Sequence, residues 1–283
     1  MATVLITGTS TGIGQATAIH LARKGYSVIA TMRNPDGYPE LAQISKEEDL
    51  GIRILPLDVN SAESVSEAFL KAGPVDVLIN NAGIGHVGPI EEAPLDQVQA
   101  VMETNYLGAL RCIQAALPSM RERREGTIIN ITSVAGRLAS PAHGIYAASK
   151  FALEAASEAL AAEVVQFGVR VAVVEPGVIA TPIFGKAAEP ETPTHYPHAR
   201  RMKALFEASL ENPVSPFVVA EKIEEILQNG ADQFRYPAGP DAAPLIAWRN
   251  GISDKDWIAS GGLDDKAWVS EMKATFGLNI QLD

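Results

Sequence analysis

Three side chains suited to proton transfer lie close together in the middle of the sequence, namely Ser133, Tyr146 and Lys150. Tyr146 and Lys150 are four residues apart, so on a helix both project from one face. An unperturbed tyrosine has a pKa of about 10, and lowering it to near 7 requires roughly 4 kcal/mol of preferential stabilisation of the phenolate. A neighbouring ammonium can supply much of this, because opposite charge favours the ionised form.

Ser133 precedes this pair at what reads as the end of a strand, where its hydroxyl could hold a carbonyl or hydroxyl oxygen beside the phenol. A tyrosine and a lysine at this spacing can also meet by accident on a helix surface. The sequence around the pair must therefore show whether the arrangement is catalytic or incidental.

The composition predicts a folded protein with a large core. The chain has 283 residues, 47% of them hydrophobic and 20% charged, enough for one large α/β domain or two small ones. The net charge of −11 argues against nucleic-acid binding and against attraction to anionic membranes. No stretch reaches the roughly 20 apolar residues that span a bilayer, and the start of the chain has no basic segment typical of a signal peptide. We expect a cytoplasmic protein.

The single cysteine, Cys112, excludes an internal disulfide and any metal site built from several cysteines. It lies in an apolar helical run, where a small packed side chain is expected rather than a nucleophile. The histidines have no acidic partners at the spacing of metal ligands, so we predict no metal.

Short apolar runs alternate with helical patterns along the chain. The runs predict strands at residues 3–7, 26–31, 52–57, 75–79, 127–131, 169–174 and 234–237. Helical patterns lie at residues 15–24, 61–71, 95–120, 146–167 and 218–228. Strands that alternate with helices form right-handed crossovers. We therefore expect an α/β fold with a doubly wound parallel sheet of about seven strands and helices on both faces.

No flexible linker divides the chain, which indicates a single domain. We assign residues 1–239 to this domain and residues 240–283 to a C-terminal extension of about two helices packed on it. Residues 184–216 are rich in proline and suggest a long, irregular connection with short helical fragments. Such a connection in a compact domain is usually functional and often a lid, so we expect this segment to border a substrate.

A glycine-rich turn follows the first predicted strand and reads Gly8-Thr9-Ser10-Thr11-Gly12-Ile13-Gly14. Between a strand and a helix, backbone N–H groups and the positive helix end can point at a pyrophosphate, and glycine lets the backbone come close. The spacing T-G-x-x-x-G-x-G differs from the commonest dinucleotide fingerprint and matches a specific variant. A purely structural turn is the alternative.

With these residues together, the chain resembles the classical short-chain dehydrogenase/reductase family, which implies a Rossmann-type fold. The glycine turn matches the family's cofactor turn. Asn80-Asn81-Ala82-Gly83 matches its N-N-A-G element, and Pro176-Gly177 with Thr181 matches its P-G-x-x-x-T element. The family's catalytic tetrad corresponds to Asn105, Ser133, Tyr146 and Lys150. Residues 146–154 and 28–33 are more loosely similar to the hydroxysteroid and retinol dehydrogenase branch.

The resemblance implies a role for each tetrad residue. Tyr146 would be the general acid in reduction and the base in oxidation. Lys150 would lower the pKa of Tyr146 and bind the nicotinamide ribose, and Ser133 would orient and polarise the substrate oxygen. Asn105 would hold a water that links Lys150 to solvent, with a buried asparagine that only bonds backbone as the alternative.

The same resemblance implies a dinucleotide site at the ends of the strands. Asp58 would read the adenine amino group, although it could instead cap the following helix, and Thr181 would hold the nicotinamide carboxamide. The full predicted cofactor set is Gly8, Ser10, Thr11, Gly12, Ile13, Gly14, Arg33, Asp58, Val59, Asn81, Ala82, Gly83, Tyr146, Lys150, Pro176, Gly177 and Thr181.

The end of the second predicted strand favours NADP over NAD. NAD binding uses a carboxylate there for the ribose 2′-hydroxyl, whereas a 2′-phosphate uses a nearby arginine. The strand ends at Thr31, Arg33 follows, and Asp36 lies too far into the loop beyond Pro35. The glycine turn itself carries no basic residue, with Thr11 at the position where some NADP-dependent relatives have one.

The substrate side is less well defined. The residues expected to surround the substrate are Ser133, Val134, His143, Tyr146 and Phe184. Neither His143 nor His86 is expected to be a catalyst, because a histidine in such a position is more often an ordinary loop residue than a catalytic one. A weakly charged, apolar pocket favours a hydrophobic secondary alcohol or ketone, such as a steroid, a retinoid or an aromatic carbonyl compound.

The helices that begin at Leu95 and Tyr146 match the faces by which relatives dimerise or form tetramers. We expect a homodimer, with a homotetramer as the alternative, because the extension could block the second contact. Two other functions compete with the oxidoreductase. A non-enzymatic dinucleotide-binding regulator would generally lose the tyrosine or lysine, and a sugar-nucleotide epimerase or dehydratase would space its glycines as T-G-x-x-G-x-x-G.

Overall fold

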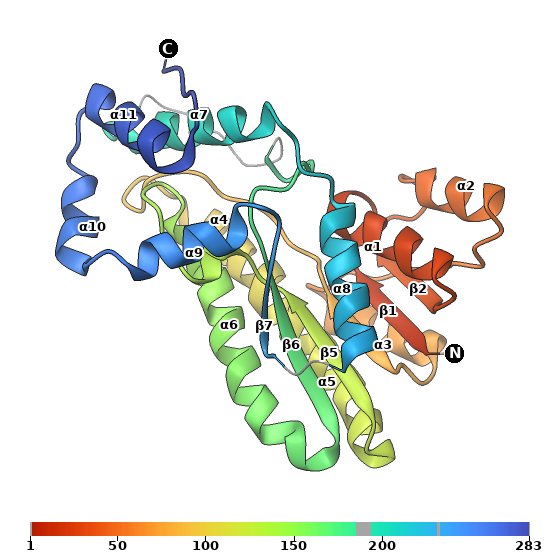
Figure 1. Cartoon of the computed structure of the whole chain (residues 1–283). Coiled ribbons are helices and arrows are strands. Elements are labelled where there is room, and N and C mark those ends of the chain that lie inside the picture. Colours follow the sequence, from red (N-terminus) through yellow and green to blue (C-terminus); the bar gives the residue numbers. More distant parts are fainter. Residues whose placement is uncertain (1, 185–193, 231–232, 283) are drawn as a thin grey trace.

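Seven parallel strands form one sheet in the order β3-β2-β1-β4-β5-β6-β7 (Figure 1). The computed structural model describes residues 2–184, 194–230 and 233–282. The strands are β1 (Thr3–Thr7), β2 (Ser27–Met32), β3 (Arg53–Pro56), β4 (Val77–Asn80), β5 (Gly126–Ile131), β6 (Val169–Pro176) and β7 (Arg235–Ala238). The order doubles back at β1 and β4, as in a doubly wound sheet. The expected fold class is confirmed.

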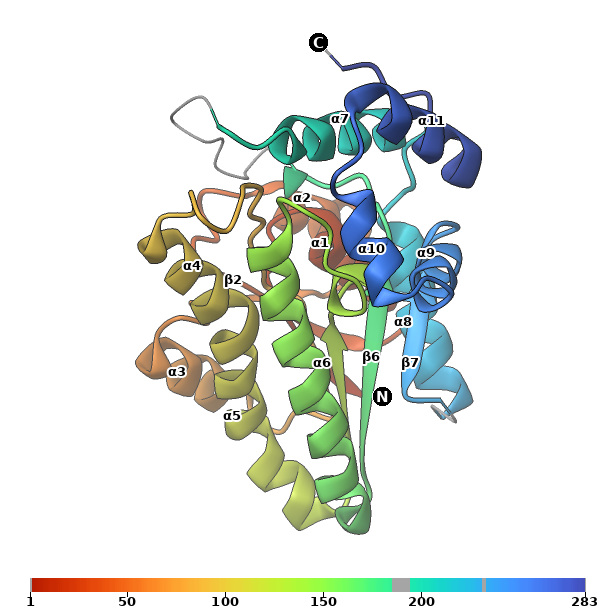
Figure 2. The same ribbon diagram turned by 90° about the vertical axis from the view of Figure 1, so that its left-hand side faces the viewer.

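Helices cover both faces of the sheet (Figures 1 and 2). The side chains of β1 alternate between the two cores: Val4 and Ile6 belong to one apolar cluster and Leu5 to the other. Strands buried on both faces read as continuous apolar runs, which is why they could be located in the sequence. One cluster packs against α1 (Gly12–Arg23) and α8 (Phe217–Asn229), and the other packs against α3 (Ala62–Ala72), α5 (Gly108–Arg123) and α6 (Gly144–Val164).

Three helical segments differ from the expectation. The stretch expected as one helix from residue 95 is α4 (Leu95–Met102), a π-helical turn η1 (Glu103–Leu107) and then α5. A helix α2 (Glu40–Glu47), which was not predicted, follows β2. It is short and buries only Leu41 and Ser45, so its apolar pattern is weak. Short 3₁₀ turns η2 (Val134–Gly136) and η3 (Val165–Phe167) flank α6.

The proline-rich segment is more regular than predicted. It contains α7 (His198–Leu210), a helix of 13 residues that begins directly after Pro197. Proline is well suited to a helix start, because its missing N–H would have no helical partner there. Residues 185–193 of this segment lie outside the described residues.

The C-terminal extension has three helices where about two were expected: α9 (Ala242–Asn250), α10 (Asp254–Ser260) and α11 (Asp265–Phe276). Ala204 of α7 shares an apolar cluster with Met272 of α11, and the two helices lie side by side at one end of the molecule (Figures 1 and 2). Arg201 of α7 donates to Asp265 Oδ1 at 2.9 Å and to the Leu263 carbonyl at 2.8 Å. The extension and α7 therefore form one cap.

None of the helices in the described part of the chain combines the length and the apolar character that a bilayer crossing needs.

A buried chain of polar side chains fixes α6 to the sheet. Asn80 donates to Asn130 Oδ1 at 2.8 Å, and Asn130 donates to Ser157 Oγ at 2.8 Å. Ser157 in turn donates to the Leu153 carbonyl of α6. Asn80 Oδ1 is buried without a hydrogen-bond partner, so these bonds are what offsets the cost of burying the polar groups. This series of hydrogen bonds thus fixes the position of α6 relative to β4 and β5.

Replacing Asn130 by alanine is expected to lower the free energy of unfolding by about 3 kcal/mol, because the buried amide of Asn80 loses its acceptor. Urea unfolding followed by circular dichroism measures this change. The exposed Asn212 is the control, and Asn212→Ala should change the stability by less than about 0.5 kcal/mol. Equal stability of the two variants would contradict the role given to Asn130.

Candidate active site

A cavity of about 560 Å³ lies at the carboxyl ends of the strands. Its walls come from the turn after β1, the ends of β2, β4, β5 and β6, the start of α6, α7 and the C-terminal extension. The predicted site residues line this one cavity, apart from Gly14 and Asn105. Residues 185–193 of the predicted substrate segment lie outside the described residues. Among the residues that the structure describes, no group of three or more His, Cys, Asp or Glu side chains could hold a metal ion.

The glycine turn is fastened to the loop after β4. Asn81 Nδ2 donates to the carbonyls of Thr7 and Gly8, at 2.9 and 3.0 Å. Gly8 has a φ of +70°, and a Cβ there would lie 2.7 Å from Ala82 Cα. A Cβ on Gly14 would lie 2.4 Å from the Gly8 carbonyl oxygen. The two glycines therefore allow the turn to pack tightly, and Gly14 acts through this packing because it does not line the cavity.

The start of α1 is suited to an anion. Thr11 is the N-cap residue, but its side chain makes no capping hydrogen bond, and the first turn carries no acidic residue. The first N–H groups of a helix lack helical partners and carry partial positive charge. Ser10, Thr11, Gly12 and Ile13 line the cavity. The donors at this helix end therefore fit the pyrophosphate of a dinucleotide.

The ends of β2 and β3 present one charge of each sign. Arg33 is exposed and lines the cavity, whereas Asp36 does not line it. Asp58 accepts a hydrogen bond from the Asn60 N–H at 3.0 Å. The helix after it is capped by Ser61, which accepts from the Ser64 N–H. Asp58 thus stabilises the turn before α3, and the alternative that it caps this helix is wrong.

Tyr146 and Lys150 lie one helical turn apart at the start of α6. Lys150 is buried, its Nζ donates to the Ile131 carbonyl at 2.9 Å, and it lies 5.6 Å from the centroid of the Tyr146 ring. Ser133 follows β5 and caps η2, where its Oγ accepts from the Ala135 N–H at 3.1 Å. Ser133 also hydrogen-bonds Tyr146. The carbonyl of Ile131 therefore fixes the position of the lysine ammonium near the tyrosine ring.

Burial dominates the ionisation of both groups. It raises the pKa of Tyr146 to about 12, against which the hydrogen bond with Ser133 acts. It lowers the pKa of Lys150 to about 8, and the charge of Glu154 opposes this change. The sequence led us to expect a Tyr146 pKa lowered by Lys150. In the protein without a bound cofactor the pKa of Tyr146 is raised instead, because the hydrogen bond from Ser133 does not make up for the hydration that the phenolate loses on burial.

Asn105 lies in the π-helical turn and is 1% exposed. Its Oδ1 accepts from the Ile84 N–H at 2.8 Å, and its Nδ2 donates to the Ile84 carbonyl and to Ser149 Oγ, both at 3.0 Å. These bonds correspond to the alternative of a buried asparagine that bonds backbone. A Cβ on Gly83 would lie 3.3 Å from Asn105 Oδ1 and 3.8 Å from Lys150 Nζ, so glycine keeps space beside both groups.

An aromatic wall faces the tyrosine. The His143 ring stacks on the Tyr146 ring with 4.7 Å between centroids, and Phe206 of α7 contacts His143 edge-on at 5.5 Å. Phe184 lies 4.8 Å from Phe206. Burial, followed by the charge of His86, lowers the pKa of His143 to about 4, so His143 is neutral at pH 7 and extends the apolar wall.

Several lining residues were missed in the sequence. They come from α7 and from the extension: Met202, Leu205, Phe206, Trp248, Trp257, Trp268 and Phe276. One sequence signal could have indicated them, because all three tryptophans of the chain lie within residues 240–283. Tryptophan concentrated in one segment of an otherwise aromatic-poor chain indicates an apolar surface that is put to use.

The phenol of Tyr146 should stay protonated well above neutral pH in the protein alone, because its raised pKa favours the neutral form at any lower pH. Ultraviolet difference spectra of wild type minus Tyr146→Phe, recorded across a pH titration, should show no phenolate signal below about pH 10. A phenolate that appears near neutral pH would mean that Lys150 outweighs burial.

Known proteins are similar to this chain over most of its length. The family model described as short chain dehydrogenase matches residues 2–192. The chain is 37% identical to retinol dehydrogenase 8 of Bos taurus over 262 residues, which is 87% of this chain and 84% of that protein. It is 40% identical to 17-beta-hydroxysteroid dehydrogenase type 1 of Mus musculus over 191 residues, which is 65% of this chain and 56% of that protein.

A solved structure of a short-chain dehydrogenase from Streptomyces avermitilis superposes with a TM-score of 0.80 and 31% identity, and the match covers 96% of each chain. The agreement thus includes the extension and the catalytic segments. A family model that spans residues 2–192, relatives that oxidise or reduce CH–OH groups, and the shared fold lead to one assignment. The chain belongs to the short-chain dehydrogenase/reductase family and is an oxidoreductase that uses a nicotinamide dinucleotide.

Proposed function

We propose that the protein transfers a hydride between NADP(H) and a hydrophobic secondary alcohol or ketone, with Tyr146 as the general acid and base. One observation carries this proposal: the side chains of Ser133, Tyr146 and Lys150 line the same cavity as the glycine turn. The remaining wall of that cavity is largely aromatic and aliphatic. Reactive groups, a dinucleotide site and an apolar wall thus border one space.

The residues that would hold the dinucleotide come from successive strand ends. The free N–H groups at the start of α1 would bind the pyrophosphate, and Asp58 would bind the adenine amino group. Thr181 would bind the carboxamide and Lys150 the nicotinamide ribose. When bound, the dinucleotide supplies or accepts the hydride, and the protein supplies position and charge.

Ser133 and Tyr146 would act on the substrate oxygen. Their hydroxyls are hydrogen-bonded to each other, so both can approach one oxygen atom between the nicotinamide side and the aromatic wall. In reduction, Tyr146 would donate its phenolic proton to the carbonyl oxygen. The pKa of about 12 keeps this phenol protonated at neutral pH, which suits proton donation.

In the direction of oxidation, the phenol must instead release its proton. Positive charge close to the ring favours the phenolate, and it would come from the Lys150 ammonium together with an oxidised nicotinamide. The space beside Gly83, between Asn105 and Lys150, would admit the water through which Lys150 exchanges protons with solvent.

The substrate class follows from the wall opposite the phenol. His143 is neutral there, and Phe184 and Phe206 contact each other. An extended apolar alcohol or ketone, such as a retinoid or a steroid, would bury its surface against these rings and the tryptophans of the extension. The retinol and 17-beta-hydroxysteroid dehydrogenases among the relatives support this class.

A regulator that binds a dinucleotide without catalysis is not favoured, because the reactive tyrosine and lysine are both in place. A sugar-nucleotide enzyme is not favoured either, because the glycine spacing differs and the wall is apolar. We also propose a homodimer through α4, α5 and α6. The exposed apolar side chains Leu95, Leu107, Phe151 and Val165 on and beside these helices support that contact.

An assay of NADPH or NADH consumption against a panel of steroid, retinoid and aromatic ketones tests the function. Wild type should reduce at least one of them, and Tyr146→Phe should be slower by about 10²–10⁴-fold, the usual worth of a positioned proton donor. The Phe variant should still bind NADPH, measured by fluorescence quenching. Equal inertness of both proteins with intact binding would instead favour the regulator.

NADP preference depends on Arg33. Replacing it by alanine is expected to raise the KM for NADPH by about tenfold, a loss typical of one charge-assisted contact, and to leave the KM for NADH nearly unchanged. Steady-state kinetics with both cofactors measure this difference. Arg53, at the start of β3 and away from the cavity, provides the control, since Arg53→Ala should affect neither KM. Equal loss with both cofactors in Arg33→Ala would contradict the assignment.

A further inference from the structure

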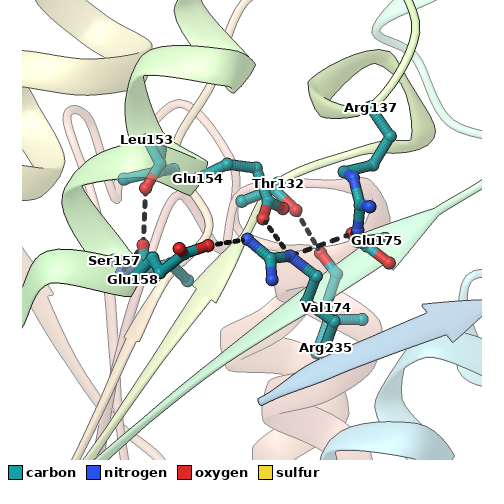
Figure 3. Close-up of polar contacts among 10 residues, drawn as sticks. Thr132, Arg137, Leu153, Glu154, Ser157, Glu158, Val174, Glu175 and Arg235 are labelled. Carbon is teal, nitrogen blue, oxygen red and sulfur yellow. Dashed lines mark hydrogen bonds and ion pairs between the residues drawn. The ribbon is translucent and has the colours of Figure 1, made fainter. Parts of the chain in front are cut away.

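Figure 3 shows a cluster of charged side chains formed by Arg137, Glu154, Glu158, Glu175 and Arg235. Arg235 of β7 donates through Nε to Glu154 Oε2 at 3.0 Å and also pairs with Glu158. Arg137, just after η2, pairs with Glu175 of β6 at 3.0 Å, and Arg235 Nε lies 3.8 Å from the same carboxylate. The cluster therefore joins α6, η2, β6 and β7.

Two of its acids are almost fully buried. The side chains of Glu154 and Glu175 are 5% and 1% exposed, whereas that of Glu158 is 65% exposed. Glu154 Oε1 is buried without a hydrogen-bond partner. Burial, followed by the charge of Glu154, raises the pKa of Glu175. The printed ion pairs of these three acids are all with Arg137 and Arg235, and Lys150 is the next cation along α6, one turn before Glu154.

Glu154 is also fixed in place by packing. It is one helical turn after Lys150 on α6, so the two side chains share a face. A Cβ on Gly136 of η2 would lie 2.9 Å from Glu154 Cγ, which places the acid against the turn that follows Ser133. The side chain of Glu154 thus packs against η2, and its carboxylate pairs with Arg235 of β7.

The charged and titratable groups around Lys150 come from every element that packs on α6. Those elements are η1, η2, η3, α4 and β6, with β7 beyond β6 and with the end of β5 at the Lys150 ammonium. Glu103 of η1 is paired with Arg111, and Asp96 of α4 is exposed. The remaining groups are His143, Tyr146, Glu154, Glu158, Arg137, Glu175 and Arg235. Among them, it is the charge of Glu154 that favours the protonated form of Lys150.

We propose that Glu154 is a positioning residue that keeps Lys150 cationic, with Arg235 supplying the countercharge that allows a buried carboxylate at this place. Burial alone would favour the neutral amine. A fixed anion one turn away offsets that tendency, so Lys150 retains its charge at the pH where Tyr146 must be influenced. The importance of that charge for catalysis rests on the proposed function, whereas the effect of Glu154 on Lys150 does not.

Glu154→Gln keeps the shape of the side chain and removes its charge. The expected result is that the titration midpoint of Lys150 falls by about one pH unit, the size of effect that one nearby opposite charge has. Above both midpoints, the cationic fraction would then be about tenfold smaller. Proton and carbon NMR of lysine-labelled full-length protein measures the midpoint, with Lys150→Met identifying the signal.

Two further variants separate charge from structure. Glu158→Gln removes an acid that pairs with the same arginine but is exposed, and it should leave the midpoint of Lys150 unchanged. Glu154→Asp keeps the charge and should restore most of the midpoint. If Glu154→Gln is folded, as judged by thermal unfolding, and Lys150 titrates as in wild type, the proposal is wrong and Glu154 has only a structural role.

The same titrations distinguish this proposal from the proposed function. A shifted Lys150 midpoint together with an acid-shifted alkaline limit of kcat/KM supports both. If Glu154→Gln shifts the midpoint of Lys150 but Tyr146→Phe is as active as wild type, the role of Glu154 is supported and the catalytic role of Tyr146 is overturned.

Discussion

Parallel strands all end at the same edge of their sheet, and this constraint determines where the reactive groups can meet. The ends of β1, β4, β5 and β6 each carry a short polar motif, and the sheet brings these motifs around one cavity. The motifs are then fixed by a few hydrogen bonds, such as those from Asn81 to Thr7 and Gly8. Without the parallel order, residues more than a hundred positions apart in the sequence would not share a site.

Desolvation and charge oppose each other in this site. Burial pushes Tyr146 toward the neutral phenol and Lys150 toward the neutral amine. The hydrogen bond with Ser133 opposes this effect on the pKa of Tyr146, and the charge of Glu154 opposes it on the pKa of Lys150. The buried acids and arginines beyond Lys150 are therefore part of the site's electrostatics as well as a clamp between α6 and β7.

Much of this arrangement could be predicted from the sequence, because strands buried on both faces appear as apolar runs and the motifs follow their ends. The glycine turn and the Ser133–Tyr146–Lys150 spacing are local patterns of this kind. The remainder depends on tertiary packing. The pKa of Tyr146 depends on its burial, and the hydrogen bonds of Asn105 depend on Ile84 and Ser149. The helix α7 was not predicted because the prolines around it indicated an irregular segment. The cap formed by α7 and the extension brings together residues that share no local motif.

The tryptophans, which dominate the fluorescence of a protein, are confined to one part of this molecule. All three lie in the extension and line the cavity. The Trp248 ring contacts the rings of Trp257 and Phe276, and the Arg201 guanidinium lies 5.7 Å from the centroid of the Trp268 ring. The tryptophan emission of the protein therefore originates in the cap and not in the sheet, so it reports on the part of the molecule where we propose that the substrate binds.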